Sequence, residues 1–318
     1  MISSNHMKKI VVLGGGNGAS LTLNALKSLG SEYSLTGVIS VADNGGSSGK
    51  LREELGVLPP GDLLRAVLAL SEYDFEMLKD IFYKTRFTDV GKISNHNLGN
   101  LFITFAAQYS DLLSALKAFG QALRVRGTVL PATLESVDLC AELSNGEIMR
   151  GEESIDDPQY SRELTVKRVF LDPAPQALPE AIQAIREADL LVLGGGDIYS
   201  SMVASLLPTG IQEAIGESTA PIVYVSNRYY HTNGETVSHK VSEIIVELEK
   251  YLPRKIDVVL IDPTPITETE REAVAVKKWG VKENDLENIS CKIVEGKFDA
   301  HSIGIDPPIL GQTFKKIL

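Results

Sequence analysis

The chain has 318 residues, of which 43% are hydrophobic and 23% are charged, and its formal net charge is −11. The acidic balance argues against a nucleic-acid-binding surface, and no apolar run approaches the roughly 18 residues that a membrane helix needs. Cys140 and Cys291 form neither a disulfide framework nor a metal-ligand spacing, so we expect a reduced, cytoplasmic setting. Residues Met1 to His6 precede a second Met-Lys-Lys start at Met7, and we interpret them as an added remnant outside the domain.

Strand and helix patterns alternate along the first part of the chain. Short apolar runs that end in turn residues predict strands at 9–13, 35–42 and 128–133. Apolar residues at helical spacing predict helices at 19–29, from about 63, and at 75–84, 97–109 and 111–124. A glycine-rich turn follows each of the first two strands.

The second part of the chain opens with a predicted β-hairpin, 137–143 and 147–150, in which Asn145-Gly146 favours a type I′ turn. The acidic stretch 151–157 is expected to be an exposed loop beyond this hairpin. Further strands are predicted at 166–171, 190–193, 222–226, 258–261 and 293–294. Helices are predicted at 179–188, from about 198, at 236–252 and at 268–279, the last with Trp279 in the core or at an interface.

This alternation predicts an α/β fold. We expect a Rossmann-like, mostly parallel sheet with helices on both faces, plus the β-hairpin as an insertion. A chain of this length could form one large domain or two, but no linker clearly divides it. The sequence therefore favours a single domain over 7–318.

The first glycine-rich turn follows a buried strand and opens a helix. Such a turn presents backbone N–H groups at the positive end of a helix dipole, which suits a phosphate. The candidate ligand-binding residues are Gly14, Gly15, Gly16, Asn17 and Gly18. The pattern Gly14-x-Gly16-x-x-Ala19 also satisfies the dinucleotide fingerprint, with Asp43 at the ribose position, which gives an NAD hypothesis. The alternative is that these glycines only form a tight turn.

The second glycine-rich turn is more informative. Its small residues let the backbone approach a ligand closely, its two hydroxyls can donate to phosphate oxygens, and two basic residues follow. The candidates are Asp43, Asn44, Gly45, Gly46, Ser47, Ser48, Lys50 and Arg52. The turn is not a Walker A loop, because Leu51 stands where that loop requires Ser or Thr. The alternative is a solvated surface loop.

Three more segments carry candidate residues. His96 and Asn97, at a predicted helix start, either contact a base or sugar or cap the helix. A third glycine-rich turn supplies Gly195, Gly196 and Ser200, although the Asp197 carboxylate is expected to cap the following helix and repel an anion. Asn227 ends another strand. Asp43 and Asp62 are candidate ligands of a Mg²⁺ ion that bridges to phosphate.

The segments 14–20, 43–50, 194–200 and 227–228 all follow predicted strand ends. In open α/β sheets ligands bind beyond those ends at a topological switch point, so we expect the four segments to converge on one crevice. We expect a diphosphate to lie between the first two turns. No nucleophile triad or carboxylate pair is recognisable by spacing, and His231, His239 and His301 are expected to be surface or core residues.

The motifs resemble the YvcK-like gluconeogenesis-factor family (UPF0052), which is related to CofD, the 2-phospho-L-lactate transferase of coenzyme F420 synthesis. The resemblance runs from about Lys8 to at least Ser200, and more weakly to the end. It rests on 12–18, 43–52, Gly61-Asp62 and 96–100. CofD proteins carry an acidic Gly-Asp-Asp-type segment after the second strand, whereas this chain carries the Asp-Asn-Gly-Gly-Ser form of the YvcK-like branch.

The resemblance implies a cytoplasmic protein that binds a UDP-sugar such as UDP-N-acetylglucosamine and acts in gluconeogenic growth, the cell envelope and cell shape. It implies no reaction for this branch. The CofD branch would imply Mg²⁺-dependent transfer of phospholactate from a nucleotide-activated donor to a deazaflavin. An NAD-dependent oxidoreductase is the third hypothesis, and a homodimer and a regulatory protein partner are further hypotheses.

The chain departs from the family pattern at three places. After Gly61-Asp62 the family has an Arg two places beyond the Asp and then Asn, but here Leu64 and Arg65 follow, so the basic contact is displaced to Arg65 or lost. Asp197 stands where the family has Ser, which opposes a phosphate at the third turn. After Gly234-Glu235-Thr236 the expected Asp-Gly is replaced by Val237-Ser238.

Overall fold

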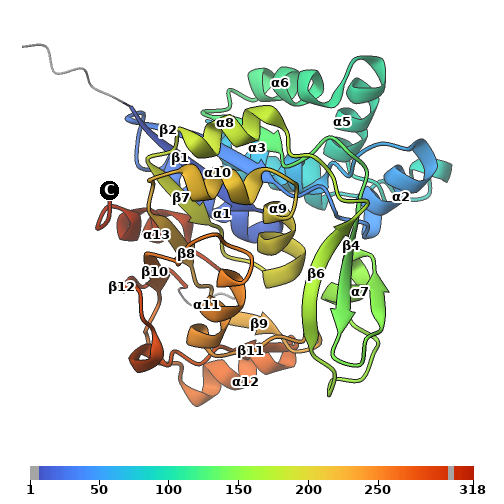
Figure 1. The fold of residues 1–318 in the computed structure, drawn as a ribbon. Helices are drawn as coiled ribbons and strands as arrows, with labels where there is room; N and C mark the ends of the chain where they lie inside the picture. Colours follow the sequence, from blue (N-terminus) through green and yellow to red (C-terminus); the bar gives the residue numbers. More distant parts are fainter. Residues whose placement is uncertain (1–6, 300–303) are drawn as a thin grey trace, which may run out of the picture.

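The computed structural model describes residues 7–299 and 304–318, so the expectations for Met1 to His6 and for His301 lie outside the described residues. The described part of the chain is built around one large sheet with helices packed on it (Figure 1). None of the helices in this part has the length and apolarity that a bilayer crossing requires.

The large sheet has seven strands, and all of its neighbouring pairs are parallel. In spatial order the strands are β12 (Lys292–Glu295), β10 (Val258–Ile261), β8 (Ile222–Val225), β7 (Leu190–Leu193), β1 (Lys8–Gly14), β2 (Tyr33–Ile39) and β3 (Thr128–Pro131). The predicted α/β fold with a parallel sheet is therefore confirmed.

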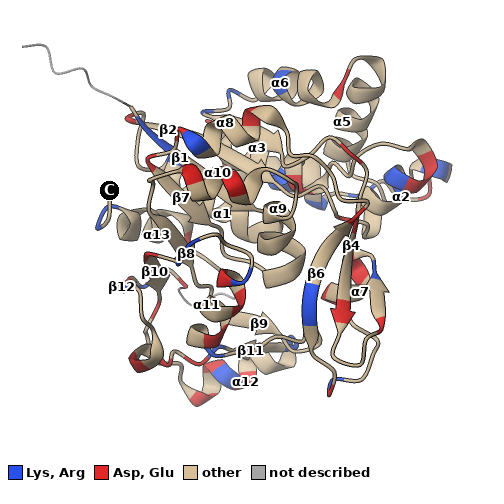
Figure 2. Cartoon of the chain, in the orientation of Figure 1, with Lys and Arg blue, Asp and Glu red and all other residues tan. Residues whose placement is uncertain are grey.

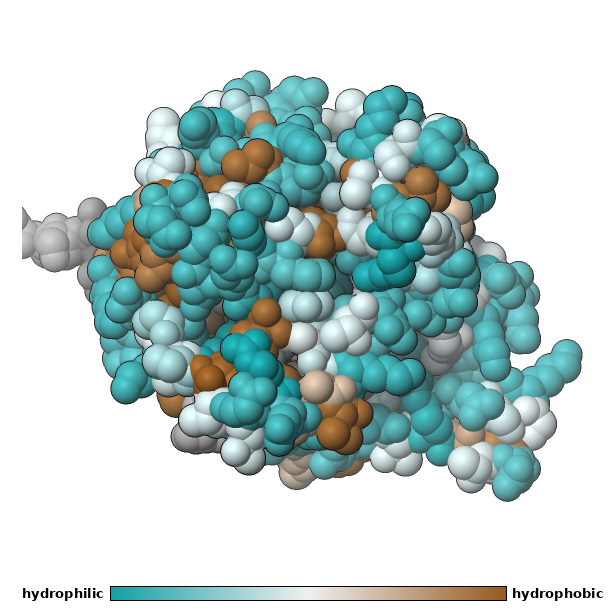
Figure 3. All heavy atoms as spheres, turned by 90° about the horizontal axis from the view of Figure 1, so that it is seen from below, coloured by the Kyte–Doolittle hydropathy of each residue, from teal (hydrophilic) through white to brown (hydrophobic). Residues whose placement is uncertain are grey.

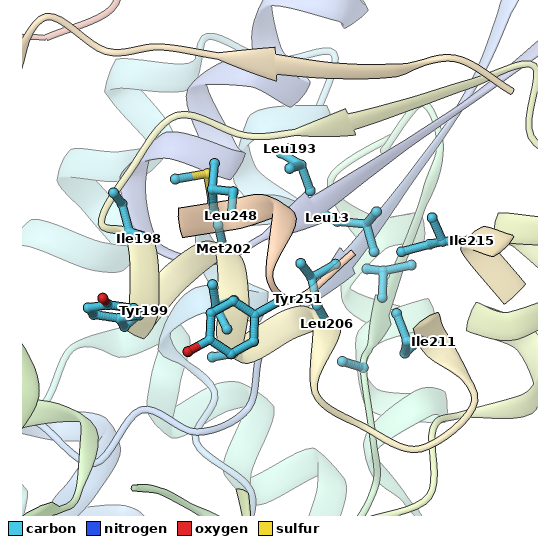
Figure 4. Packing of buried hydrophobic residues seen from close by; sticks show 14 of the residues in the cluster. Leu13, Leu193, Ile198, Tyr199, Met202, Leu206, Ile211, Ile215, Leu248 and Tyr251 are labelled. Carbon is cyan, nitrogen blue, oxygen red and sulfur yellow. The ribbon is translucent and has the colours of Figure 1, made fainter. Parts of the chain in front are cut away.

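Alternate residues of the central strand β1 enter two different cores. Val11 and Leu13 belong to the cluster on one face of the sheet, and Ile10 and Val12 belong to the cluster on the other face. Such burial on both faces explains why β1 is a continuous apolar run rather than an alternating one. Figure 4 shows the first cluster, in which Leu13 and Leu193 of the sheet pack near Ile198, Met202 and Leu248.

The helices divide between the two faces. One face is covered by α1 (Gly16–Lys27), α3 (Gly61–Leu70) and α13 (Pro307–Phe314). The other is covered by α8 (Pro179–Arg186), the π-helix η3 (Ile198–Val203), α9 (Ala204–Leu206), α10 (Ile211–Glu217) and α11 (Val241–Glu249). The α4 helix (Phe75–Lys79), the π-helix η1 (Asp80–Lys84), η2 (Gly91–Ile93), α5 (Leu98–Tyr109) and α6 (Leu112–Ala122) follow α3, and α2 (Gly46–Leu55) precedes it. The α12 helix (Glu268–Val276) and η4 (Leu286–Asn288) lie in the C-terminal part.

Two small antiparallel sheets complete the fold. One pairs β5 (Ile148–Arg150), β4 (Asp138–Leu143) and β6 (Val166–Asp172), and the other pairs β9 (Tyr229–His231) with β11 (Trp279–Val281). The predicted hairpin is thus confirmed, but its turn type is wrong. Gly146 has a φ of +89° whereas Asn145 has no positive φ, and Gly146 N–H donates to the Leu143 carbonyl, so the turn is a three-residue loop with a glycine bulge.

Three other predictions of local structure are wrong. The stretch 151–157 contains a helix, α7 (Glu152–Asp156), whose Ile155 is fully buried, because this segment packs against the main body rather than extending into solvent. Trp279 lies on β11, since the left-handed Lys278 (φ +60°) follows the end of α12. The α11 helix begins at Val241 rather than at 236.

The face seen from below is mostly hydrophilic, and its hydrophobic side chains form small separate groups (Figure 3).

Candidate functional site

The strand order of the large sheet reverses between β1 and β7. From β1 the chain proceeds outward through β2 and β3, and from β7 it proceeds the other way through β8, β10 and β12. A cavity of about 690 Å³ lies at this switch point, where parallel α/β sheets bind their ligands. The four turns that follow β1, β2, β7 and β8 all line it, with Gly16, Asn17, Gly18, Asp43, Gly45, Gly46, Ser47, Ser48, Gly195, Gly196, Ser200 and Asn227.

Two of these turns touch each other through glycine. A Cβ on Gly18 would stand 0.8 Å from the Gly195 carbonyl oxygen, so the backbone of the first turn lies directly against that of the third. Within the second turn, a Cβ on Gly49 would stand 1.9 Å from the Asn44 carbonyl oxygen. Gly18 and Gly49 are therefore required for backbone packing, whatever the turns bind.

Two carboxylates that line the cavity accept hydrogen bonds from backbone N–H groups of the first two turns. The Gly16 N–H donates to Asp62 Oδ2 (2.7 Å), and Arg65 forms an ion pair with the other oxygen of Asp62. The Gly45 N–H donates to Asp43 Oδ1 (2.9 Å). Burial, followed by the negative charge of Asp62, raises the pKa of Asp43 to about 6. These two carboxylates lie near each other in a partly buried site, where a cation would stabilise both.

Lys50 and Arg52 do not face this cavity. Lys50 is exposed, and Arg52 Nη2 donates to Asp138 Oδ1 of β4 at 2.6 Å. Asn44 is also turned away, because its Oδ1 accepts from the Glu153 N–H (2.9 Å). The basic side chains after the second turn therefore do not supply positive charge to the cavity. Arg52 instead anchors the hairpin sheet to α2.

Among the described residues, the basic side chains that line the cavity are Arg65, Lys79 and Arg86. Two of them flank the ring of Tyr83, which also lines the cavity: the Cζ atoms of Arg65 and Arg86 lie 5.0 and 5.5 Å from its centroid. Burial lowers the pKa of Lys79. Sequence reasoning placed a helix at 75–84 but missed its role, although three basic residues within 79–86 were an available signal.

A chain of hydrogen bonds connects the second turn to residues behind it. Ser47 Oγ lies 2.9 Å from His96 Nδ1 and accepts from Asn100 Nδ2 (3.1 Å). Ser47 and Asn100 line the cavity, whereas His96 and Asn97 lie behind them, and Asn97 Oδ1 caps α5 by accepting from the Asn100 N–H (2.7 Å). Burial lowers the pKa of His96, which favours the neutral ring, and this ring and the Ser47 hydroxyl share one hydrogen bond through Nδ1 and Oγ. The predicted polar cluster is therefore one of positioning and capping groups.

The opposite wall is acidic and comes from α7. Glu152, Glu153, Asp156 and Asp157 line the cavity. Burial, then the charge of Asp43, raises the pKa of Glu152 to about 10, and burial together with Asp197 raises that of Asp156 to about 7. The sequence analysis missed this wall because four acidic residues among the six positions 152–157 are typical of a solvated loop.

The helix that follows the third turn is capped by Glu235 and not by Asp197, the residue expected to cap it. Asp197 makes no capping hydrogen bond with the described backbone, contrary to our prediction. Instead Glu235 accepts from the N–H groups of Ile198 (2.8 Å), Tyr199 (2.9 Å) and Ser200 (2.7 Å). The positive end of η3 is therefore occupied by a side chain of the chain itself.

Asn227 is held by a buried lysine. Lys282 Nζ donates to Asn227 Oδ1 (2.5 Å), and Asn227 Nδ2 donates to the Tyr229 carbonyl (3.1 Å). Burial lowers the pKa of Lys282 to about 8. Tyr229 and Trp279, from the small β9–β11 sheet, line the same part of the cavity and give it an aromatic wall.

The acidic wall predicts a pH-dependent stability. The carboxyl of Glu152 is protonated in the folded chain, whereas it ionises above about pH 4.5 in the unfolded chain. The free energy of unfolding therefore decreases as the pH rises from about 4.5 toward 10. The Glu152→Gln variant should therefore exceed the wild type in free energy of unfolding by about 1–3 kcal/mol at pH 8–9, and by less at pH 5. Urea titrations at both pH values measure this. The exposed neighbour Glu153, changed to Gln, is the control, and parallel pH curves for Glu152→Gln and wild type would contradict the prediction.

Known proteins resemble this chain over most of its length. It matches the family described as 2-phospho-L-lactate transferase CofD over residues 10–298. The gluconeogenesis factor of Halalkalibacterium halodurans is 39% identical over 274 residues, which cover 85% of this chain and 82% of that protein. A crystal structure of a UPF0052 family member from Bacillus halodurans has a TM-score of 0.87 at 33% identity, covering 97% of this chain and 98% of the other.

Other relatives are longer. A putative gluconeogenesis factor of Clostridium acetobutylicum is 38% identical over 299 residues, which are 91% of this chain but 64% of that protein. A putative gluconeogenesis factor of a Nostoc species is 43% identical over 238 residues, which are 74% of this chain and 50% of that protein. The chain thus spans between half and two thirds of the length of these two relatives.

Proposed function

The chain belongs to the CofD family, in its gluconeogenesis-factor (UPF0052) group, and from that premise we propose that it binds a nucleotide sugar such as UDP-N-acetylglucosamine. The observation that supports this most directly is the meeting of four strand-end turns at one cavity of about 690 Å³. This volume lies within the range of small-molecule sites. The proposed role is regulatory, in carbon metabolism, the cell envelope and cell shape, in the cytoplasm and with a protein partner that reads the ligand state.

The charges around the cavity suggest how a diphosphate is held. The backbone at 17–18 and 46–48 lines the cavity and offers neutral N–H donors, whereas the N–H groups of Gly16 and Gly45 already donate to Asp62 and Asp43. Nearby carboxylates oppose an anion. Arg65, Lys79 and Arg86 supply the balancing positive charge from the α3–η1 side. In this proposal the diphosphate lies between the glycine turns and these three cations, and Tyr229 and Trp279 border the remaining part of the ligand.

A Mg²⁺ ion fits the same site. Asp43 and Asp62 offer two carboxylates beside the proposed phosphates, and burial followed by the charge of Asp62 raises the pKa of Asp43, so a further cation beside it would favour the ionised carboxylate. The described residues contain no cluster of three or more His, Cys, Asp or Glu side chains that could hold a metal. This is the usual situation for Mg²⁺, which takes one or two carboxylates and completes its shell with phosphate and water. When bound it would neutralise phosphate charge.

Calorimetric titration tests the proposal. UDP-N-acetylglucosamine should bind, more tightly with Mg²⁺ than without it, while ADP-, GDP- and CDP-linked compounds and NAD(H) test the base and the dinucleotide alternative. Absence of binding by every one of these compounds at millimolar concentration would overturn the proposal.

Arg86→Ala should weaken the binding of UDP-N-acetylglucosamine by about 10–100-fold, because one of three facing cations is lost. Lys50→Ala is the matched control: this residue is exposed and does not line the cavity, so the affinity should stay within about twofold of wild type at moderate salt. Calorimetry measures both. Equal affinities for Arg86→Ala and wild type, or a larger loss in Lys50→Ala, would contradict the assignment of the cationic wall.

A CofD-like transferase is the second candidate, supported by the match over residues 10–298. It requires a deazaflavin acceptor and a phospholactyl-nucleotide donor in the same cavity with Mg²⁺. Incubation with both substrates and detection of the phospholactyl-deazaflavin product by mass spectrometry tests it. Tight binding of UDP-N-acetylglucosamine without any such product would favour the regulatory proposal.

A further inference from the structure

The strand order divides the cavity into two ends. The second turn follows β2, the first follows β1, the third follows β7 and Asn227 follows β8, and these four strands are neighbours in that order. Neighbouring strands lie about 4.8 Å apart, so the two outer positions of this row are separated by about 14 Å. A diphosphate between the first two turns therefore occupies one end, and the other end is left for a different part of the ligand.

We call the part of the cavity beyond β7 and β8 the third-turn end. The N–H groups at the start of η3 already donate to Glu235, so they are not available to a second phosphate there. The side chains of the third-turn end are instead acidic, aromatic or neutral and polar. They are Asp156, Asp197, Asn227, Tyr229, Trp279 and Asp299.

The acids of the third-turn end lack positive charge. Burial, followed by the charge of Asp197, raises the pKa of Asp156 to about 7, and burial also raises the pKa of Asp299 to about 7. The α7 helix, which carries Asp156, contains acidic residues and no basic one (Figure 2). A cation brought by the ligand would therefore favour the ionised carboxylates.

The neighbouring cations do not balance these acids. Lys282 acts on both Asp197 and Asp299, but its own burial lowers its pKa to about 8. Arg228 acts on Asp299. Arg65 acts on Asp197 less strongly than Lys282 does, and it is already paired with another carboxylate.

One carboxylate oxygen at this end has no partner. Asp299 is 1% exposed, and its Oδ2 accepts from the Arg228 N–H (2.8 Å), whereas its Oδ1 accepts no hydrogen bond from the described residues. A buried polar atom without a partner costs free energy, so native structures retain few of them. Because Asp299 lines the cavity, a hydrogen-bond donor on the ligand can complete it.

An organic cation fits this end better than a metal ion does. Among the residues that the structure describes, no three His, Cys, Asp or Glu side chains converge as a metal site requires. The carboxylates lie along the cavity wall, and Tyr229 and Trp279 line the cavity beside them. Carboxylates give an ammonium group charge-assisted hydrogen bonds, and aromatic rings attract it through their faces.

We propose that the ligand carries a positively charged ammonium group that binds at the third-turn end. This inference rests on the proposed function, and it narrows the ligand class to nucleotide-linked amino sugars whose amine is free rather than acetylated. The diphosphate then lies against the cationic side chains of the α3–η1 side, and the ammonium group lies against the acids of the opposite end.

Calorimetric titration with three UDP-sugars at pH 6.5, where a sugar amine is protonated, tests this inference. UDP-glucosamine and UDP-glucose differ only in carrying an ammonium or a hydroxyl group at one carbon, and UDP-N-acetylglucosamine reports on the proposed function. The wild type should bind UDP-glucosamine at least about 10-fold more tightly than UDP-glucose, because only the amine forms ion pairs in the partly buried site. Higher salt should reduce this preference.

Asp299→Asn should lower the preference for UDP-glucosamine to about threefold or less, because it removes the charge but keeps an oxygen for the Arg228 N–H. Asp89→Asn is the matched control: this residue is exposed, lies outside the cavity and has a left-handed backbone (φ +56°) that asparagine tolerates. Its preference should equal that of wild type. Circular dichroism melts check folding, and Asp156→Asn, with the same expected loss, replaces Asp299→Asn if that variant does not fold.

The outcomes separate this inference from the proposed function. Equal affinities of the wild type for UDP-glucosamine and UDP-glucose, or an unchanged preference in Asp299→Asn, would overturn the ammonium site. Binding of UDP-N-acetylglucosamine in the same experiment would leave the proposed function standing. If none of the three sugars binds, the inference falls together with the assignment of a UDP-sugar.

Discussion

Gly18→Ala should lower the free energy of unfolding by more than about 4 kcal/mol, or prevent folding altogether. The added Cβ would stand 0.8 Å from the Gly195 oxygen, 1.9 Å from the Gly195 carbonyl carbon and 2.7 Å from the Gly196 nitrogen. All three are backbone atoms, so no side chain can rotate away. The third turn is also fixed, because β7 pairs with β1 and the Gly194 N–H donates to the Leu13 carbonyl (3.1 Å).

Gly216→Ala is the matched control for this substitution. Gly216 lies in α10, and its added Cβ would meet Pro253 at ordinary contact distances of 3.4 and 3.5 Å. Because alanine is a better helix former than glycine, this variant should be as stable as wild type or slightly more stable. Urea unfolding followed by circular dichroism compares the two. A Gly18→Ala variant with wild-type stability would show that the first and third turns do not press together as described.

Most of the fold could be predicted because the large sheet is buried on both faces. Most of its strands are short apolar runs, and β1 sends alternate residues into two cores, so local composition alone indicates these strands. The order of the strands is not local information. A topological switch point was expected from the general behaviour of open α/β sheets, but its place between β1 and β7 was not predicted from any residue of this chain.

The errors occur where tertiary packing overrides local pattern. Residues 152–156 have the pattern of a solvated acidic segment, yet the buried side chain of Ile155 and the hydrogen bond from the Glu153 N–H to Asn44 hold them as α7 against the body. Trp279 fits the helical spacing of 268–279, but the chain turns at Lys278 and pairs with β9 instead. Pairing with a strand nearly fifty residues earlier has no signature in the sequence window around Trp279.

The positions of the glycine-rich turns were predicted better than the directions of the charged side chains. Glycine-rich turns are sequence-local, and those that follow β1, β2 and β7 line one cavity as expected. The direction of a long side chain is not local. Arg52 pairs with Asp138 of the hairpin sheet, while Lys79, at the end of α4, and Arg86, just after η1, line the cavity from a segment that carries no motif.

Glu235→Ala should reduce the free energy of unfolding by about 3–5 kcal/mol. The Glu235 carboxylate is 6% exposed as a residue and accepts from the N–H groups of Ile198, Tyr199 and Ser200 at 2.7–2.9 Å. Truncation removes the acceptor of three buried donors at once, and each unsatisfied donor costs free energy. Urea unfolding measures the loss, and Glu235→Gln, which keeps one acceptor oxygen, should fall between Ala and wild type.

Glu213→Ala provides the comparison, because Glu213 caps α10 from an exposed position by accepting a single N–H, that of Gly210 (3.0 Å). Water can replace that bond, so the loss should be about 1 kcal/mol or less. If Glu235→Ala lost no more than Glu213→Ala, solvent would reach the first turn of η3. The N–H groups there would then be accessible to a ligand, and the proposed confinement of the diphosphate to the turns after β1 and β2 would have to be abandoned.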